Sequence, residues 1–574
     1  MPTALAEAIE NYRRAVELNP ADARSLAALG QALRSANCNA EATAFLEKAA
    51  SLLPQDAQLH CDLGDALQDL GRLPEAITAY QNALNVDPHR ARAWYSMGCA
   101  QNRRQEYVAA ITCFQNAIDL EPDWLEARHN LAQALFQIGQ VSEALAHFRK
   151  CAAQGRERSA LSRAMIALII PGAPEADNAA ILNARSTFVG QDLVQLAWES
   201  SFSSRATLRH QPLRIGYLSS FFHRPNWMKP VWGLINQHDR ERLEIHLFSD
   251  APASRVECSY RAHPEDRFHE VTSLSNQALG ALIRKCGIDV LIDLNGYSNL
   301  HRLPLFTLRP APIAVGWFNL YATTGMRSFD YLIGDEQVIP MEEEPFYSEK
   351  ICRVPGSYLT FEVNYPVPEV AAPPCLTNGR ITFGCLASQY KITSEVVAAW
   401  SRILRQSPTS SLALKNQVLD SPASRGFVHR LFERNGIARE RVRLEGPADH
   451  SQFLRMYDEI DLALDTFPYN GGTTTTEAIW QGVPVLSFRG DRWASRTSAS
   501  ILRAADLGEF VVRDLEEYVS FASQLANSPN TWERLARLRR GMRSQLLNSP
   551  VCDTRAFARQ MERLYEWMSV SEGR

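Results

Sequence analysis

Residues 57–90 read AQLHCDLGDALQDLGRLPEAITAYQNALNVDPHR, and a 34-residue period carries this pattern through about the first 155 positions of the chain. The same step separates the prolines Pro20, Pro54, Pro88 and Pro122 and the alanines Ala8, Ala42, Ala76, Ala110 and Ala144. A fixed period of this length is typical of helical repeat arrays, in which each unit buries its apolar face against its neighbour. The first part of the chain is therefore predicted to be an all-α array.

Small and large residues keep the same phase within the period. The phased residues are Gly30, Gly64 and Gly98 in the first helix of each pair, and Tyr12, Leu46, Tyr80, Phe114 and Phe148 in the second. We expect the glycines to let two antiparallel helices approach, the large residues to fill the gap between neighbouring pairs, and the proline to end the second helix.

This pattern resembles the tetratricopeptide repeat. The array is predicted to span residues 1–158, with a leading second helix followed by pairs at about 23–56, 57–90, 91–124 and 125–158. The resemblance implies a superhelix whose concave face binds partner proteins. A spacer or a dimer contact is the alternative, because the pattern specifies the scaffold and not the ligand.

Length and composition limit the class of protein. A chain of 574 residues is too long for one hydrophobic core, so two to four domains are expected. The net charge of -4 gives no cue for nucleic acid or an anionic membrane. The eleven cysteines include no C-x-x-C pair, which favours reduced thiols over a disulfide framework. There is no basic leader and no run of 18 apolar residues, so we expect a cytoplasmic protein, either monomeric or a homo-oligomer.

From Leu213 onward, short apolar runs alternate with helical stretches, which is typical of parallel sheets in α/β folds. A proline-rich break at 367–374 divides the runs into two sets, which predicts two Rossmann-like lobes at 209–370 and 371–574. The second lobe includes a closing helix at about 554–570, and a helical linker is expected at 159–208, broken at Pro171–Pro174. The predicted strands are Leu213–Ser219, Leu243–Phe248, Asp289–Leu294, Ile313–Trp317 and Asp330–Gly334 in the first set, and Ile381–Leu386, Ser411–Leu414, Val442–Glu445, Leu462–Asp465, Val483–Phe488 and Phe510–Val512 in the second.

The segment LDTFPYNGGTTTTE, from Leu464 to Glu477, follows one of these strands. Its glycines would let the backbone come close to a ligand, and its threonines would open a helix whose unpaired N–H groups suit a pyrophosphate. The carboxylate about one turn into the helix would accept hydrogen bonds from a ribose. A capped helix after a tight turn is the alternative. The candidate donor-binding residues here are Gly471, Gly472, Thr473, Thr474, Thr475 and Glu477.

This segment resembles the donor-binding loop of the O-linked N-acetylglucosamine transferases and of the related SPINDLY O-fucosyltransferases. Further similar segments are Gly216–Ser219, Leu294–Tyr297, Leu308–Ile313, Ile381–Gly384 and Gln389–Thr393. Together with the repeats, the resemblance covers nearly the whole chain. It implies an α-superhelix followed by a GT-B fold, a nucleotide-sugar donor, and transfer to Ser or Thr hydroxyls of proteins with inversion. It also implies that no metal cofactor is required, and the sequence contains no Asp-x-Asp pair that would hold one on a diphosphate.

The resemblance also assigns roles to individual residues. Lys391, just past a strand end, would neutralise the leaving diphosphate as a catalytic residue, with Gln389 donating beside it. A surface lysine is the alternative. Ala448 and His450 fall in the loop that frames the nucleotide base, and Glu477 stands where the transferases often have Asp. The resemblance also implies that Thr473 and Thr474 contact the phosphates of the donor.

The match weakens after the first strand. Phe221 stands where the family has Asp, and His223 arrives about two positions before the family's histidine near the acceptor hydroxyl. A histidine suits general-base catalysis near neutral pH, so His223 is the candidate base, with a surface loop histidine as the alternative. Phe453 replaces a second family histidine near the base.

The sequence therefore predicts a protein O-glycosyltransferase that uses UDP-N-acetylglucosamine (UDP-GlcNAc). Three alternatives stay open at this point. The same chemistry with GDP-fucose is suggested by Leu464–Tyr469, which resembles the plant-type branch. A weakly catalytic adaptor that binds nucleotide and partner proteins is suggested by Phe221 and the displaced His223. A nucleotide-sugar epimerase of GT-B fold would explain the lobes but not the repeats.

Overall fold

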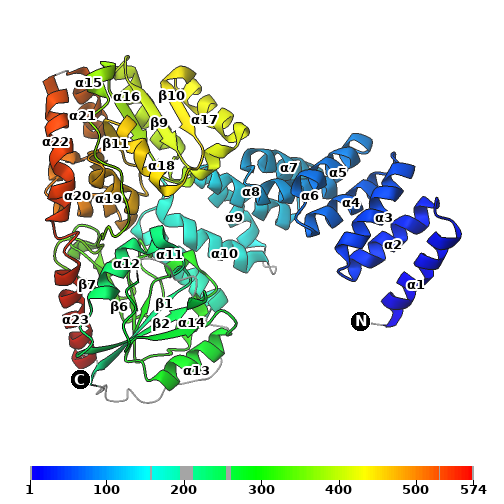
Figure 1. Ribbon diagram of the computed structural model, residues 1–574, viewed down its shortest axis with the longest axis horizontal. Helices are drawn as coiled ribbons and strands as arrows, with labels where there is room; N and C mark the ends of the chain where they lie inside the picture. Colours follow the sequence, from blue (N-terminus) through cyan, green and yellow to red (C-terminus); the bar gives the residue numbers. More distant parts are fainter. Residues whose placement is uncertain (1–2, 155–157, 194–210, 254–259, 529, 572–574) are drawn as a thin grey trace. The chain divides into compact units, whose positions relative to one another are not determined.

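A computed structural model of the chain describes residues 3–154, 158–193, 211–253, 260–528 and 530–571. The chain forms two compact units, one of residues 1–154 with 420–427 and the other of residues 155–419 with 428–574. The repeat helices lie in the first unit, and both parallel sheets lie in the second; Figure 1 shows the elements of each. Within the described ranges, no helix combines the length and the apolar character needed to cross a membrane.

The repeat unit has the predicted architecture. A leading helix, α1 (Thr3–Leu18), precedes four antiparallel pairs. The pairs are α2 (Ala23–Ser35) with α3 (Asn39–Leu52), α4 (Ala57–Asp69) with α5 (Leu73–Val86), α6 (Ala91–Arg103) with α7 (Tyr107–Leu120), and α8 (Leu125–Gln137) with α9 (Val141–Ala153). The helices α1, α3, α5 and α7 each end two residues before a phased proline, which confirms the predicted helix ends.

The phased glycines and large residues pack against each other. A Cβ atom added at Gly64 would lie 2.6 Å from the ring of Tyr80, and one at Gly98 would lie 2.7 Å from the ring of Phe114. In both cases the large residue belongs to the second helix of the same pair. Tyr80 also shares a buried cluster with Ala93 and Met97 of α6, so the large residue fills space inside its own pair as well as towards the neighbouring pair.

A helical segment precedes the first sheet. It contains α10 (Arg158–Ile169), a short turn η1 (Ile170–Gly172) at the predicted break, α11 (Asn178–Phe188) and the π-helical turn η2 (Val189–Leu193). Arg185 of α11 is buried and donates hydrogen bonds to the carbonyls of Leu320 and Thr323. These bonds hold the segment against the first lobe. Residues 194–208 of the predicted linker lie outside the described residues.

The first lobe is built on a seven-stranded parallel sheet in the order β3-β2-β1-β4-β5-β6-β7. Its strands are β1 (Leu213–Ser219), β2 (Leu243–Ser249), β3 (Arg267–Glu270), β4 (Val290–Asp293), β5 (Ile313–Gly316), β6 (Tyr331–Gly334) and β7 (Lys350–Arg353). Its helices are α12 (Pro225–Gln237), α13 (Asn276–Cys286) and α14 (Leu303–Thr307), with the short turns η5 (Gly296–Ser298) and η6 (Met341–Phe346). The edge strands β3 and β7 were not predicted, because they are short and largely polar.

The second lobe holds a six-stranded parallel sheet in the order β10-β9-β8-β11-β12-β13. Its strands are β8 (Thr382–Cys385), β9 (Ser411–Lys415), β10 (Val442–Glu445), β11 (Leu462–Leu464), β12 (Val485–Phe488) and β13 (Val511–Val512). Its helices are α15 (Cys375–Asn378), α16 (Ser394–Gln406), α17 (Pro422–Arg434), α18 (His450–Arg455), α19 (Thr473–Trp480), α20 (Thr497–Ala504), α21 (Leu515–Asn527) and α22 (Asn530–Leu547). Its short turns are η7 (Gln389–Lys391), η8 (Gln417–Asp420), η9 (Arg439–Arg441), η10 (Met456–Glu459), η11 (Trp493–Ser495) and η12 (Gly508–Phe510).

The last helix, α23 (Thr554–Ser571), packs on the first lobe, although the sequence placed it within the limits of the second. The hydroxyls of Tyr217 in β1 and Tyr565 in α23 lie 3.0 Å apart, and His238 Nδ1 lies 3.0 Å from Glu562 Oε1. Figure 1 shows this helix beside β6 and β7. The amphipathic pattern indicated a buried face, but it could not indicate which lobe covers that face.

Candidate active site

Both sheets have a point at which the strand order reverses. In the first lobe β2 and β3 lie on one side of β1 and β4 on the other, and in the second lobe β8 is flanked by β9 and β11 in the same way. Ligands of doubly wound folds bind at the carboxyl ends of the strands at such points. In the second lobe these strand ends lead into Gln389–Lys391 and Leu464–Glu477, the two segments that the sequence assigned to the donor.

Lys391 reaches the loop that follows β11. Its Nζ donates a hydrogen bond of 2.7 Å to the carbonyl of Asn470 and lies 4.1 Å from the centre of the Tyr469 ring. Burial lowers the pKa of Lys391 to about 8, although the carboxylate of Asp465 opposes the shift. The ammonium group is therefore mostly charged at neutral pH and is the kind of group that a diphosphate would pair with. The structure brings Lys391 next to the threonine segment, as the prediction required.

The side-chain amide of Gln389 has an N–H donor that no described residue accepts. The side chain is 2% exposed, and its Oε1 accepts a hydrogen bond of 3.2 Å from Asn416 Nδ2. Among the described residues, its Nε2 is buried without a hydrogen-bond partner. A buried amide group that lacks a partner is costly, so a ligand oxygen at this point would remove a penalty as well as form a bond.

The loop before α19 is held by Asp465. Its Oδ1 accepts a hydrogen bond of 3.0 Å from the Gly471 amide, and its Oδ2 accepts one of 2.7 Å from Ser487 Oγ. A Cβ atom at Gly471 would lie 2.6 Å from Thr474 Oγ1, whereas one at Gly472 would meet nothing closer than 3.7 Å. Gly471 is therefore required by packing. At Gly472, the N-cap of α19, the same Cβ would make only ordinary van der Waals contacts, so packing does not require a glycine there.

The threonines of α19 divide into two groups. Thr473 and Thr474 are partly exposed in the first turn, where backbone N–H groups have no partner within the helix. Thr475 is buried, and its hydroxyl lies 2.8 Å from Ser498 Oγ within the lobe. Thr473 and Thr474, the predicted phosphate contacts, are thus accessible in the first turn, and Thr475 has a contact that supports the helix.

Glu477 does not face open space. Its Oε1 accepts a hydrogen bond of 2.6 Å from Lys229 Nζ, and the two side chains are 5% and 3% exposed. Burial lowers the pKa of Lys229 and raises that of Glu477, and the ion pair opposes both shifts. Lys229 lies on α12 of the first lobe, so this pair joins the two lobes at the predicted ribose position.

Sequence reasoning missed Lys229. Its partner is 248 positions away, and a single lysine gives no periodic signal. The available signal was its place in the apolar run WMKPVWGLI of residues 227–235, where an isolated charge requires a partner.

His450 lies beside the Lys229–Glu477 pair. Its Nε2 lies 3.1 Å from Lys229 Nζ and 3.6 Å from Glu477 Oε1, and its ring packs edge-on against Tyr365. Burial and the neighbouring Lys229 lower the pKa of His450 to about 4, so the imidazole is neutral at pH 7. Ala448 lies in the loop before α18 and is partly exposed. The structure therefore brings His450 to the predicted nucleoside end of the site.

His223 lies in the connection between β1 and α12 and is partly exposed. Next to it, Phe221 stacks on Trp227 with ring centres 5.0 Å apart. Two other first-lobe residues contact the predicted donor residues: Lys229, six positions further along the chain, pairs with Glu477, and Tyr365 packs against His450. A role for His223 as a base stays a prediction.

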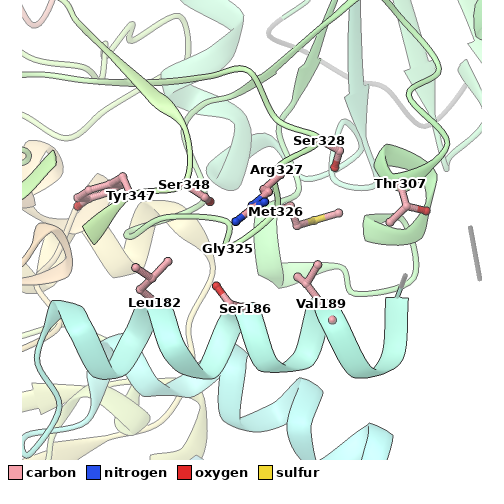
Figure 2. Close-up of a pocket in the computed structure, with 11 residues that line it drawn as sticks. Leu182, Ser186, Val189, Thr307, Gly325, Met326, Arg327, Ser328, Tyr347 and Ser348 are labelled. Carbon is pink, nitrogen blue, oxygen red and sulfur yellow. The ribbon is translucent and has the colours of Figure 1, made fainter. Parts of the chain in front are cut away.

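A cavity of about 600 Å³ lies between the helical segment and the first lobe, and other residues line it. Figure 2 shows Leu182, Ser186 and Val189 spaced along one side of α11 and its continuation, facing the Gly325–Ser328 segment. Most of the lining is apolar, and Arg327 is the one charged side chain among the lining residues. None of the predicted donor residues lines it.

Comparison with known proteins gives a consistent result. Residues 178–371 and 372–561 match the model of glycosyl transferase family 41. Residues 64–103 match a TPR repeat, and residues 95–158 match a tetratricopeptide repeat.

Individual relatives and one solved structure are also similar. The chain is 29% identical over 388 residues to the probable UDP-N-acetylglucosamine–peptide N-acetylglucosaminyltransferase SPINDLY of Solanum lycopersicum, and 31% identical over 365 residues to the SEC protein of that description from Arabidopsis thaliana. These matches cover 66% and 62% of this chain but only 40% and 36% of the relatives, so the chain spans about two fifths of their length. A lysine-to-methionine mutant of the Thermobaculum terrenum O-GlcNAc transferase superposes with a TM-score of 0.76 at 28% identity, over 90% of this chain and 98% of that one.

Proposed function

The chain belongs to glycosyl transferase family 41, and on that premise we propose that it is a protein O-glycosyltransferase. The proposed reaction transfers N-acetylglucosamine from UDP-GlcNAc to Ser or Thr hydroxyls of proteins, with inversion at the sugar carbon. The observation that supports it most is the switch point of the second lobe, where Lys391 and Gln389 lie beside the loop that leads into α19. The names of the curated relatives support the same donor.

In this proposal the diphosphate of the donor lies between Lys391 and the first turn of α19. The helix N-terminus offers unpaired N–H groups and a positive dipole end, and the Nε2 of Gln389 adds a donor that has no other partner among the described residues. Negative charge grows on the diphosphate as the glycosidic bond breaks. Fixed donors and the Lys391 ammonium then bind the transition state more strongly than the ground state.

Lys391 also supplies the positive charge that a metal would otherwise provide. We therefore propose that no metal cofactor is needed at the diphosphate. The loop carbonyl of Asn470, which accepts from Lys391 Nζ at 2.7 Å, would hold the ammonium group in place before the donor binds. A phosphate oxygen would then add a second partner to the same nitrogen.

The nucleoside is proposed to lie near Glu477, His450 and Ala448. Glu477 would accept hydrogen bonds from ribose hydroxyls with its second carboxylate oxygen while Lys229 holds the first. Since His450 is neutral at pH 7, it would contact the base as an imidazole and not as a cation.

The acceptor is proposed to be a protein that the repeat array selects. The repeats match a class of protein-binding repeat, and a small-molecule enzyme has little use for such an array. His223 is proposed as the base that removes the proton from the acceptor hydroxyl, since a histidine titrates near neutral pH.

The test is a calorimetric titration of the full chain with UDP and with GDP, followed by hydrolysis assays with the matching nucleotide sugars. We expect UDP to bind more tightly and UDP-GlcNAc to be hydrolysed. Lys391→Ala should abolish hydrolysis and transfer with an unchanged circular dichroism spectrum, because the leaving diphosphate loses its cation. The exposed Lys285→Ala is the matched control and should keep full activity.

Other outcomes separate the remaining possibilities. Near-normal turnover by Lys391→Ala would refute the phosphate assignment. Tighter binding of GDP with hydrolysis of GDP-fucose would replace the donor. Binding of nucleotide without any hydrolysis or transfer would make the protein an adaptor.

A further inference from the structure

Three potential metal ligands meet at one edge of the first lobe, outside the proposed donor site. His246 lies on β2, His269 on the edge strand β3, and Cys286 at the last position of α13. The ligand atoms of all three lie within 4.8 Å of one another. His246 Nδ1 is 3.0 Å from His269 Nε2, and Cys286 Sγ is 4.0 Å from His269 Nε2. We propose that these three side chains bind one zinc ion.

The sheet register explains why the two imidazoles face each other. In the parallel pairing of β2 with β3, His246 is opposite Arg267 and Phe248 is opposite His269. Residues two apart on a strand point to the same face, so His246 and His269 share one face of the sheet. The two rings are nearly parallel, with an angle of 10° between their planes. Backbone geometry therefore brings both ring nitrogens to one point, and the end of α13 brings the thiol.

Two of the three separations between ligand atoms are close to those of a tetrahedral site. Zinc binds histidine nitrogen at about 2.0–2.1 Å and cysteine sulfur at about 2.3 Å, which places neighbouring ligand atoms roughly 3.3–3.6 Å apart. The observed 3.0 Å and 4.0 Å lie on either side of that range. His269 and Cys286 are only partly buried, so small side-chain rotations would bring the ligand atoms to the required separations.

A second shell supports the assignment. His246 Nε2 lies 3.0 Å from Glu244 Oε1, and a carboxylate can only accept a hydrogen bond there, so Nε2 carries the hydrogen and Nδ1 presents its lone pair. The other oxygen of Glu244 accepts from Arg214 Nε at 3.1 Å. A histidine that donates to a carboxylate with one nitrogen and presents the other is the usual form of a metal-binding histidine. The charges of Arg214 and Glu244 cancel each other. The thiolate of Cys286 would offset part of the charge of the zinc ion.

The chemical class of the ion follows from the ligands. Two imidazoles and one thiolate suit zinc, whereas magnesium and calcium prefer oxygen ligands. Three protein ligands leave one position for water, which the partial exposure of His269 and Cys286 permits. The ion would join β2, β3 and α13, and so would fix the short edge strand that only its pairing with β2 otherwise holds in the sheet.

The test uses the full chain, stripped of metal and titrated with Co²⁺ as a spectroscopic substitute and with Zn²⁺ in competition with a coloured chelator. We expect one ion per chain, with the visible bands of tetrahedral cobalt and the near-ultraviolet band of a thiolate bound to cobalt. Cys286→Ser should remove the thiolate band and weaken zinc binding at least tenfold. Glu244→Gln should weaken it about 10-fold to 100-fold through the second shell.

Cys38→Ser, at an exposed cysteine of the repeat unit, is the matched control and should bind as the unmodified chain does. Removal of zinc from the unmodified chain should lower its melting temperature, and zinc should restore it, which gives a measurement that needs no variant. A cobalt complex without the thiolate band would overturn the proposal. Equal zinc affinity in Cys286→Ser and Cys38→Ser would also overturn it, and the two histidines would then form only a hydrogen bond.

Discussion

Replacing Lys229 with methionine tests the buried pair that joins the two lobes. Methionine keeps the length and apolar character of the lysine stem but removes the charge, so Glu477 keeps a carboxylate that is 5% exposed with no ammonium partner. Leaving one charge of a buried pair alone typically costs about 3–5 kcal/mol. A proton taken up by the carboxylate, or by His450 Nε2 at 3.6 Å from Glu477 Oε1, relieves the unpaired charge, and protonation of the carboxylate sets an upper limit on the cost.

The limit can be worked out from the pKa of a free glutamate, 4.5. One pKa unit corresponds to about 1.4 kcal/mol, so protonating this group at pH 7 costs roughly 3.4 kcal/mol, and at pH 5.5 roughly 1.4 kcal/mol. In the variant the folded state would hold a proton that the unfolded state releases above pH 4.5. The raised pKa therefore gives stability below that pH that is lost as the pH rises.

Urea unfolding at pH 5.5 and pH 7 measures this difference. We expect Lys229→Met to lower the free energy of unfolding of the α/β unit by about 3 kcal/mol at pH 7 and by about 1 kcal/mol at pH 5.5. The repeat transition serves as an internal reference, and adding Glu477→Gln to Lys229→Met should restore most of the loss, because no charge is then buried alone. A loss under 0.5 kcal/mol at pH 7 with no pH dependence would refute the argument.

Three further predictions concern the donor and the acceptor. UDP affinity should fall as the pH rises through about 8, where Lys391 loses its charge, by up to roughly tenfold per pH unit. Lys391→Arg should remove that dependence. A calorimetric titration that shows constant affinity from pH 7 to 9.5 would contradict this prediction. Gly471→Ala should weaken UDP binding at least tenfold, because the new methyl group would meet the Thr474 hydroxyl at 2.6 Å. Gly472→Ala should have a small effect on UDP binding, because the nearest neighbour of its methyl group would lie at 3.7 Å. Equal losses of affinity in the two variants would count against the packing argument. Removing residues 1–155 should leave UDP-GlcNAc hydrolysis intact but reduce transfer to protein, and unchanged protein modification would make the array a spacer.

The fold could be predicted from the sequence wherever a pattern repeats. The 34-residue period fixed the helix pairs, and apolar runs marked eleven strands within two residues of their observed limits. The edge strands β3 and β7 were not predicted, because a strand with one neighbouring strand and a solvent-exposed face needs no apolar run. The lobe on which α23 packs was also not predicted, because an amphipathic pattern shows that one face of a helix is buried but does not identify the element that buries it.

The site was predictable only in part. Lys391 and the threonine segment follow strand ends, and the family resemblance named them, so the structure could place them side by side. For Lys229 the sequence offered only an isolated charge in an apolar run, because an ion pair between distant residues leaves no local pattern that identifies the partner. The same holds for His246 and His269, whose approach depends on the register of a strand that the sequence did not reveal.

The position of α23 has a consequence for synthesis on the ribosome. The first lobe begins at β1, but the helix that covers α12 is made only after the whole second lobe, at residues 554–571. A Cβ atom on Gly233 of α12 would lie 2.6 Å from Thr554, so this contact is close and leaves no room for a substitute side chain. Domains usually fold in the order in which they emerge. Here the repeats can fold early, whereas the surface of α12 that α23 covers stays uncovered until the last part of the chain is released.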